Sequence, residues 1–137
     1  MKLNHLGIAV KDIKSAVHHF EDSLGWWKKS EIIYDPIQDV RVLFMGDDNN
    51  ILYELIEPAS KDSPIIKLLD KKISLYHFCY EVDDIETTIK ELSKKNFILI
   101  SGPVEAVAFR GKRIAFMFNS ENLTIELVEK NLKPQLK

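Results

Sequence analysis

The sequence predicts an α+β protein in which two tandem βαβββ modules form one curved, mixed sheet around a shared cleft. Three observations carry this prediction. The chain matches itself when it is shifted by 72 residues, which aligns His5 with His77 and Glu54 with Glu126. In both halves, a period-two pattern of apolar residues gives way to a helical pattern. With 137 residues, 45% of them hydrophobic and 29% charged, the chain has the size and composition of one globular domain.

The first module is expected at residues 3–58 and begins with a strand at residues 3–10, where Ile8 and Val10 share one face. Asp12 is expected to cap a helix that Gly25 ends. The helix should cover the face that carries Ile8 and Val10. Three further strands are predicted, at residues 30–34, 40–45 and 52–57.

The second module, at residues 75–130, repeats this order. Its predicted elements are a strand at 76–82, a helix at 84–94 and strands at 97–100, 113–118 and 123–129. Residues 59–74 form a linker with a short helix at 65–69, and residues 131–137 are expected to be a frayed, flexible tail. The constant register of the repeat indicates internal duplication, and the two modules are expected to form a single domain over residues 1–137.

Composition excludes several classes of protein. Nineteen Lys and Arg residues against 21 Asp and Glu residues give a net charge of -2, which does not favour binding to nucleic acid or to an anionic membrane. The single cysteine, Cys79, excludes a disulfide framework and a cysteine-based zinc site. No apolar run is long enough for a signal peptide or a membrane span, so we predict a soluble, cytoplasmic protein. Exposed strand edges and the pair Trp26-Trp27 favour a homodimer, although the tryptophans could equally belong to the core.

Four polar residues related by the repeat are the candidate site. Strand alternation places His5 and His77 on the face opposite the helices, and Glu54 and Glu126 interrupt apolar strands. A lone strand histidine or glutamate is more often a hydrogen-bonded or surface residue, but here one offset relates both pairs. A buried carboxylate needs compensation. Two imidazoles and two carboxylates suit one divalent ion per chain, such as Zn, Ni, Co or Mn, so the shared cleft is predicted to be a metal cleft.

Other polar positions favour ordinary roles. Glu57 and Glu129 also repeat, but at strand ends, where solvated charges or edge protection are expected. His18 and His19 are adjacent on a helix and are expected to lie at the surface. Cys79 shares the strand face of His77 and is expected to be a buried, inert thiol.

Three motifs carry a resemblance to a known family. They are residues 5–13 (His-Leu-Gly-Ile-Ala-Val-Lys-Asp-Ile), residues 76–85 (Tyr-His-Phe-Cys-Tyr-Glu-Val-Asp-Asp-Ile) and residues 124–129 (Thr-Ile-Glu-Leu-Val-Glu). Over residues 3–130 the chain resembles the vicinal oxygen chelate superfamily, which includes glyoxalase I, methylmalonyl-CoA epimerase, extradiol dioxygenases, fosfomycin-resistance transferases and bleomycin-binding proteins. The resemblance implies the glyoxalase fold and the metal ligands His5, Glu54, His77 and Glu126.

Within this superfamily, residues 54–58, 62–65 and 113–116 look similar to methylmalonyl-CoA epimerases. That likeness implies a metal-dependent isomerase that removes a proton alpha to a carbonyl through a metal-stabilised enolate, with Glu126 or Glu54 as the catalytic acid and base. The implied substrate is an acyl-CoA. The chain departs from the pattern at Val42, where some epimerases have an extra carboxylate base. It also departs at residues 107–112 and 118–119, which lack the family's histidines.

Two further functions stay open. The same ligand set and the stretch Gly102-Pro103-Val104 resemble bacterial-type glyoxalase I, which would make the protein a lactoylglutathione lyase that isomerises a glutathione adduct. A metal-free protein that binds a drug or small metabolite is a different class, and the complete ligand set argues against it. Iron-dependent ring cleavage, with two histidines and one glutamate, is disfavoured by Glu54.

Overall fold

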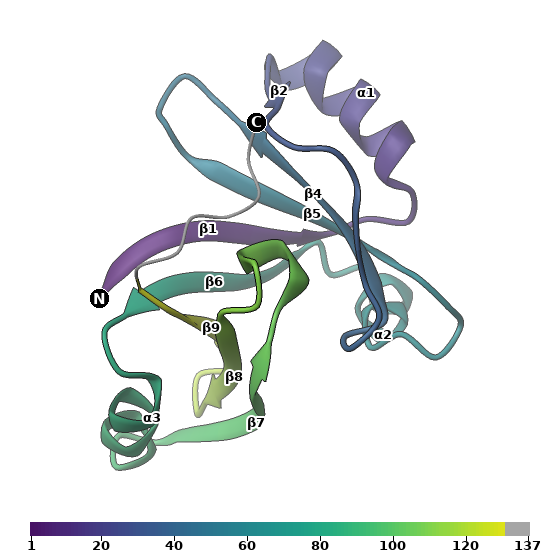
Figure 1. Cartoon of the computed structure of the whole chain (residues 1–137). Helices are drawn as coiled ribbons and strands as arrows, with labels where there is room; N and C mark the ends of the chain where they lie inside the picture. The colour runs from purple at the N-terminus through teal and green to yellow at the C-terminus, as the bar shows by residue number, and fades with distance from the viewer. Residues whose placement is uncertain (131–137) are drawn as a thin grey trace. The chain divides into compact units, whose positions relative to one another are not determined.

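The computed structural model describes residues 1–130, and its chain separates into two compact units (Figure 1). The N-terminal unit comprises residues 5–76, and the C-terminal unit comprises residues 1–4 and the described residues from 77 onward. Both units combine strands with a packed helix, so the predicted α+β class is confirmed. The predicted tail at 131–137 lies outside the described residues. Among residues 1–130, no helix has the length and apolar character needed to cross a membrane.

The first seven elements form the first module and the segment after it. They are β1 (Lys2–Ala9), α1 (Ile13–Leu24), β2 (Trp27–Lys28), β3 (Ile33–Asp35), β4 (Val40–Gly46), β5 (Leu52–Pro58) and α2 (Ile65–Asp70). The strand order is β2-β4-β5-β1, and β3 also pairs with β4. β1 runs parallel to β5, whereas β4 pairs antiparallel with β2, β3 and β5. The short helix α2 confirms the helix predicted in the linker.

The second module repeats this arrangement. Its elements are β6 (Leu75–Val82), α3 (Ile85–Ser93), β7 (Phe97–Glu105), the 3-10 helix η1 (Val107–Phe109), β8 (Arg113–Asn119) and β9 (Thr124–Glu129). The strand order is β6-β9-β8-β7, with β6 parallel to β9 and antiparallel pairing elsewhere. β6 and β9 therefore correspond to β1 and β5, as the sequence repeat predicts.

The helix boundaries follow from their caps. The Asp12 carboxylate accepts the Ser15 N–H at 2.9 Å, and the Asp84 carboxylate accepts the Thr87 N–H at 3.1 Å. Gly25 ends α1 in the left-handed region, with φ 70, which glycine adopts without a Cβ clash. The N-cap at Asp12 and the helix end at Gly25 predicted from the sequence are confirmed, and Asp84 caps α3 in the equivalent way.

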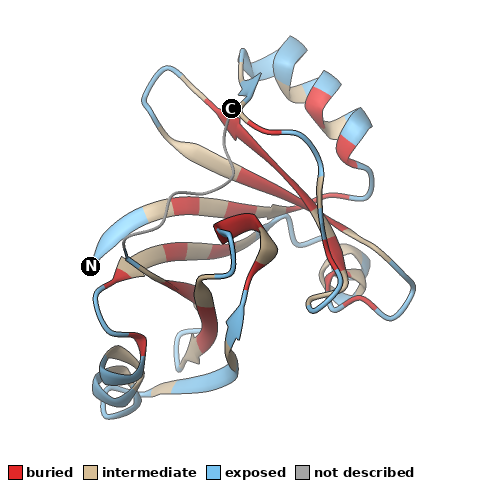
Figure 2. Ribbon diagram, viewed as in Figure 1, coloured by how far each residue is buried: buried red, intermediate tan, exposed pale blue. Residues whose placement is uncertain are grey.

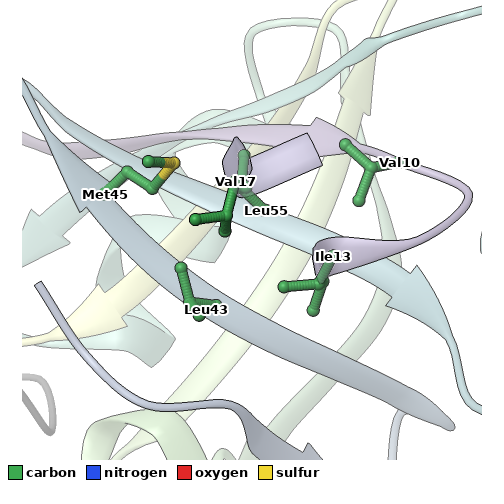
Figure 3. Close-up of a cluster of buried hydrophobic side chains, with 6 residues drawn as sticks. All are labelled: Val10, Ile13, Val17, Leu43, Met45 and Leu55. Carbon is green, nitrogen blue, oxygen red and sulfur yellow. The ribbon is translucent and has the colours of Figure 1, made fainter. Parts of the chain in front are cut away.

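Each helix packs on one face of its own strands. The core of the N-terminal unit consists of Val10, Ile13, Val17, Leu43, Met45 and Leu55 (Figure 3). The corresponding core of the C-terminal unit consists of Val82, Ile85, Ala115, Met117, Ile125 and Leu127. In Figure 2 the buried residues, drawn in red, lie mainly in the strands. Because alternate strand residues face the helices, the residues between them lie on the opposite face, where the candidate ligands were predicted.

Deleting core side chains tests this packing. We expect Leu55→Ala to lower the free energy of unfolding by about 2–5 kcal/mol, because Leu55 is completely buried and its loss leaves a cavity under α1. Urea denaturation would measure the effect. The matched control is Leu24→Ala at the exposed end of α1, which should change stability by less than about 0.5 kcal/mol. Equal losses in the two variants would contradict the assigned core.

The strand predicted at residues 30–34 is wrong in its boundaries. Two short strands, β2 and β3, pair with opposite ends of β4 instead. Between them the Ser30 hydroxyl accepts the Phe44 N–H at 2.9 Å, in place of a strand carbonyl. In the gap between β2 and β3, the Ser30 side chain therefore satisfies a backbone N–H of β4 that a neighbouring strand would otherwise pair with.

The strand predicted at residues 97–100 is too short. β7 continues to Glu105 with register shifts against β8 on both sides of Ser101. Gly102 permits this close approach, because its φ is 86 and a Cβ there would lie 2.4 Å from the Ile114 carbonyl oxygen. The Gly-Pro sequence is typical of a turn, but pairing with β8 keeps it within the strand.

Candidate metal centre

The N-terminal unit holds one buried histidine–glutamate pair. β1 carries His5 and β5 carries Glu54, and the parallel pairing of these strands places Gly7 opposite Glu54. The His5 Nε2 lies 3.2 Å from the Glu54 Oε1. Relative exposures of 1% for His5 and 6% for Glu54 show that neither residue is a solvated surface charge.

The C-terminal unit holds the equivalent pair. β6 carries His77 and β9 carries Glu126, with Cys79 opposite Glu126 in the parallel ladder. The His77 Nε2 lies 3.0 Å from the Glu126 Oε1, and the two residues are 1% and 3% exposed. The two units therefore build the same pair from corresponding strands, which is the geometry expected of a duplicated site.

A phenylalanine accompanies each pair. Phe44 on β4 lies directly across the ladder from Glu54, and Phe116 on β8 lies across from Glu126. The rings of His5 and Phe44 are 5.7 Å apart at 78°, an edge-to-face contact. The rings of His77 and Phe116 make the same contact at 5.2 Å and 83°. Sequence reasoning did not identify these phenylalanines as site residues, although their alignment in the repeat was visible.

The chemistry of the donor set fits a divalent ion. Each of the four buried residues offers one ligand atom, either an imidazole nitrogen or a carboxylate oxygen. A buried carboxylate is costly unless its charge is compensated, and an imidazole compensates it only when protonated. A divalent ion would compensate both glutamates while the histidines stay neutral, the form in which they act as ligands. That the two pairs share one ion remains a prediction.

Glu57 and Glu129 correct the sequence interpretation, because neither is simply a solvated charge at a strand end. Glu57 is 8% exposed, accepts the Ile13 N–H at 2.6 Å and pairs with Arg41. Its carboxylate thereby binds the first residue of α1, where a negative charge also favours the helix dipole.

Glu129 makes the corresponding ion pair in the C-terminal unit. It accepts the Arg113 backbone N–H at 3.0 Å and pairs with the Arg113 Nη2 at 2.9 Å. Arg113 also pairs with Glu86 at the start of α3. Both modules thus use a repeated Arg–Glu pair to join the helix start to the sheet, on the face away from the candidate ligands.

The Arg113 guanidinium beside Glu129 holds the pKa of that carboxyl below its ordinary value of 4.5. A lowered folded-state pKa stabilises the protein above the unfolded-state pKa, and this stabilisation disappears as pH falls through the folded-state pKa. We expect Glu129→Gln to lower the free energy of unfolding at pH 7 by about 0.2–1 kcal/mol, as for a partly exposed ion pair. Denaturation from pH 7 to pH 3 should show this difference begin to shrink near pH 4.5 and continue to fall as the pH is lowered further. A constant difference would contradict the assignment.

The remaining predicted positions divide between surface and core. His18 and His19 are exposed and Cys79 is buried, as expected. Trp26 stacks on Tyr53 with ring centroids 3.8 Å apart, whereas its neighbour Trp27 is 42% exposed. Trp26 therefore packs against the core, whereas Trp27 lies at the surface.

Tyr53 is an aromatic residue that sequence reasoning did not single out. Its hydroxyl donates to Asp47 at 2.8 Å. Burial, together with this carboxylate, raises the pKa of Tyr53 to about 12. A phenol held in this way stays neutral and serves the packing beside α1.

Val42, the position of a possible extra carboxylate, is buried on β4. Leu43 and Met45 on the same strand belong to the helix-side core, so alternation places Val42 on the face that carries Phe44 and Glu54. The position thus points to the candidate site but offers it only an apolar side chain.

Comparison with known proteins supplies independent evidence. The model of the Glyoxalase/Bleomycin resistance protein/Dioxygenase superfamily matches residues 4–116. The chain is 34% identical over 118 residues to the mitochondrial methylmalonyl-CoA epimerase of Homo sapiens, covering 85% of this chain and 65% of the relative. It therefore spans about 65% of the length of that relative.

Solved structures give the same picture. Hypothetical protein BH1468 from Bacillus halodurans C-125 has a TM-score of 0.83 and 30% identity, covering 98% of this chain and 97% of the other. Methylmalonyl-CoA epimerase from Mycobacterium tuberculosis has a TM-score of 0.80 and 25% identity, covering 95% and 88%. These similarities confirm the fold predicted from the sequence.

Proposed function

Because the chain belongs to the Glyoxalase/Bleomycin resistance protein/Dioxygenase superfamily, we propose that it is a metal-dependent epimerase of the methylmalonyl-CoA epimerase type. The observation that carries the proposal is the repeated, buried histidine–glutamate pair, present once in each module. Relatives named as methylmalonyl-CoA epimerases support the substrate class. The substrate proposed is therefore a small acyl-CoA with an acidic proton alpha to the thioester.

In this proposal His5, Glu54, His77 and Glu126 together hold one divalent ion, of which Zn, Ni, Co and Mn all suit the ligands. When bound, the ion would supply Lewis-acid stabilisation of the negative charge that develops on the thioester oxygen. The burial of the four residues supports this role, because electrostatic interactions are stronger where water is excluded. Residues 1–130 would then act as one domain, since each module supplies half of the ligands.

The protein's own contribution to the chemistry is proton transfer. Epimerisation inverts a carbon centre, so one base removes the proton from one face and a second group returns a proton to the other. Glu54 and Glu126 come from different modules and are the two carboxylates available for these steps. Val42 provides no third carboxylate, so in this chain both transfers fall to these two glutamates.

The test is solvent exchange at the substrate carbon. Methylmalonyl-CoA would be incubated in D2O with protein that carries Zn, Ni, Co or Mn, and deuterium at C2 followed by NMR. We expect incorporation together with interconversion of the epimers. Absence of exchange with every metal would contradict the proposal. Turnover of the glutathione hemithioacetal, with no exchange into methylmalonyl-CoA, would instead indicate a glyoxalase I-type isomerase.

The assembly and location of the protein are also proposals. We expect a homodimer, because the strand edge at β7 exposes Ile98, Leu99 and Ile100. Light scattering after gel filtration would measure the mass. We also expect a cytoplasmic location, which agrees with the composition. Fractionation of the source cells would test it.

A further inference from the structure

We propose that Phe44 and Phe116 are positioning residues that hold the imidazole rings of His5 and His77 in the orientation needed for metal ligation. This inference rests on the proposed metal site and concerns how each module prepares its half of it. Within its own unit, each phenylalanine neighbours both members of the histidine–glutamate pair. It lies across the ladder from the glutamate and contacts the histidine ring edge-to-face.

The orientation of a histidine ligand needs such support. The nitrogen lone pair lies in the plane of the ring, and the torsion that rotates this plane is broad and weakly restrained by itself. An edge-to-face contact with a neighbouring ring is the preferred geometry of an aromatic pair and restricts that rotation. Residues around metal ligands commonly fix the ligand ring in this way, and their replacement weakens metal binding.

Phenylalanine suits this position chemically. Its side chain has no atom that could bind the ion or form a hydrogen bond with the glutamate. Both rings are buried, with Phe44 0% and Phe116 7% exposed. Each ring therefore keeps water from one side of its histidine–glutamate pair. The adjacent residues on the same strands, Met45 and Met117, belong to the helix-side cores instead.

The repeat separates positioning from simple packing. Phe44 and Phe116 occupy aligned positions, as do Met45 and Met117, so each strand carries one repeated residue on each face. Only the phenylalanines face the candidate ligands. Both methionines are completely buried and provide controls for loss of core packing.

The experiment compares Phe44→Leu and Phe116→Leu with Met45→Leu and Met117→Leu by titrating the metal-free proteins with Co²⁺ and recording the visible spectrum. We expect each phenylalanine variant to bind Co²⁺ about tenfold more weakly and to show altered band positions. The methionine variants should keep the affinity and spectrum of the wild type. Phe116→Tyr keeps the ring, so its Co²⁺ affinity should stay within about threefold of the wild type, whereas Phe116→Leu should lose about tenfold.

Three results would overturn the inference. Wild-type affinity and spectrum in both phenylalanine variants would show that the rings do not orient the histidines. Equal weakening in the phenylalanine and methionine variants would assign the effect to packing, and thermal unfolding of the metal-free proteins would measure that packing directly. Failure of the wild type itself to bind Co²⁺ would refute the proposed metal site and, with it, this inference.

Discussion

Replacing His77 with alanine is expected to lower the affinity of the protein for a divalent ion by more than about 100-fold. Replacing a residue that only supports a metal ligand already lowers affinity by about 10–100-fold, and loss of a ligand itself should lower it further. The substitution removes one nitrogen donor and leaves Glu126 buried without its imidazole partner. Titration with Zn²⁺ against a chromophoric chelator would measure the loss. His5→Ala should have the same effect, because His5 occupies the equivalent position in the first module.

The matched control is His19→Ala. His19 lies exposed on α1, so its removal should leave metal affinity unchanged. Circular dichroism would establish that the His77 and His5 variants remain folded. Wild-type affinity in a folded His77→Ala protein would exclude this residue as a ligand.

Replacing Glu126 with glutamine is expected to reduce epimerisation by about 10²–10⁴-fold, the usual contribution of a positioned acid or base. Glutamine keeps the size of the side chain but cannot accept a proton from carbon. Epimer interconversion would be measured by chiral chromatography of methylmalonyl-CoA, with the metal content of each sample determined separately. Glu121→Gln, at an exposed position before β9, is the control and should retain full activity.

The two-glutamate scheme makes a sharper prediction for single variants. In this scheme each carboxylate serves one face of the substrate carbon. Each of Glu126→Gln and Glu54→Gln should therefore still exchange the C2 proton of one epimer, and the epimer that exchanges should differ between the two variants. Interconversion should be lost in both. Full epimerase activity in either metal-loaded variant would contradict the scheme.

The sequence repeat predicted the candidate ligands because it preserves both position and strand face. His5 and His77 alternate with helix-facing residues, and alternation is a local property that a sequence displays directly. The cap at Asp12 was predicted for the same reason, since a helical pattern follows it at once, and Asp84 caps α3 at the equivalent position of the repeat. Short-range patterns thus specify most of each module.

The roles of Glu57 and Glu129 were not predictable in this way. Their partners Arg41 and Arg113 are 16 residues distant in the sequence, and Ile13 is 44 residues from Glu57. Only the folded sheet brings these groups together. The repeat showed that both glutamates and both arginines recur, but it did not show that they pair.

The extended β7 has a different cause. Gly102-Pro103 has the chemistry of a turn, and local propensity therefore ended the predicted strand near Ile100. In the structure, Val104 and Glu105 resume pairing with Ile114 and Arg113 after the register shifts. Tertiary pairing overrides the local preference at this strand.

The most direct test of the central claim is the number of ions that one chain holds. Untagged protein would be stripped with a chelator, reloaded with Zn, Ni, Co or Mn, desalted and analysed for metal and protein together. Sharing of the four ligands predicts about one ion per chain, lost when either His5 or His77 is replaced by alanine. Two ions per chain, with each histidine variant losing only one, would show separate sites in the two modules. No retained ion with any metal would contradict the metal centre altogether.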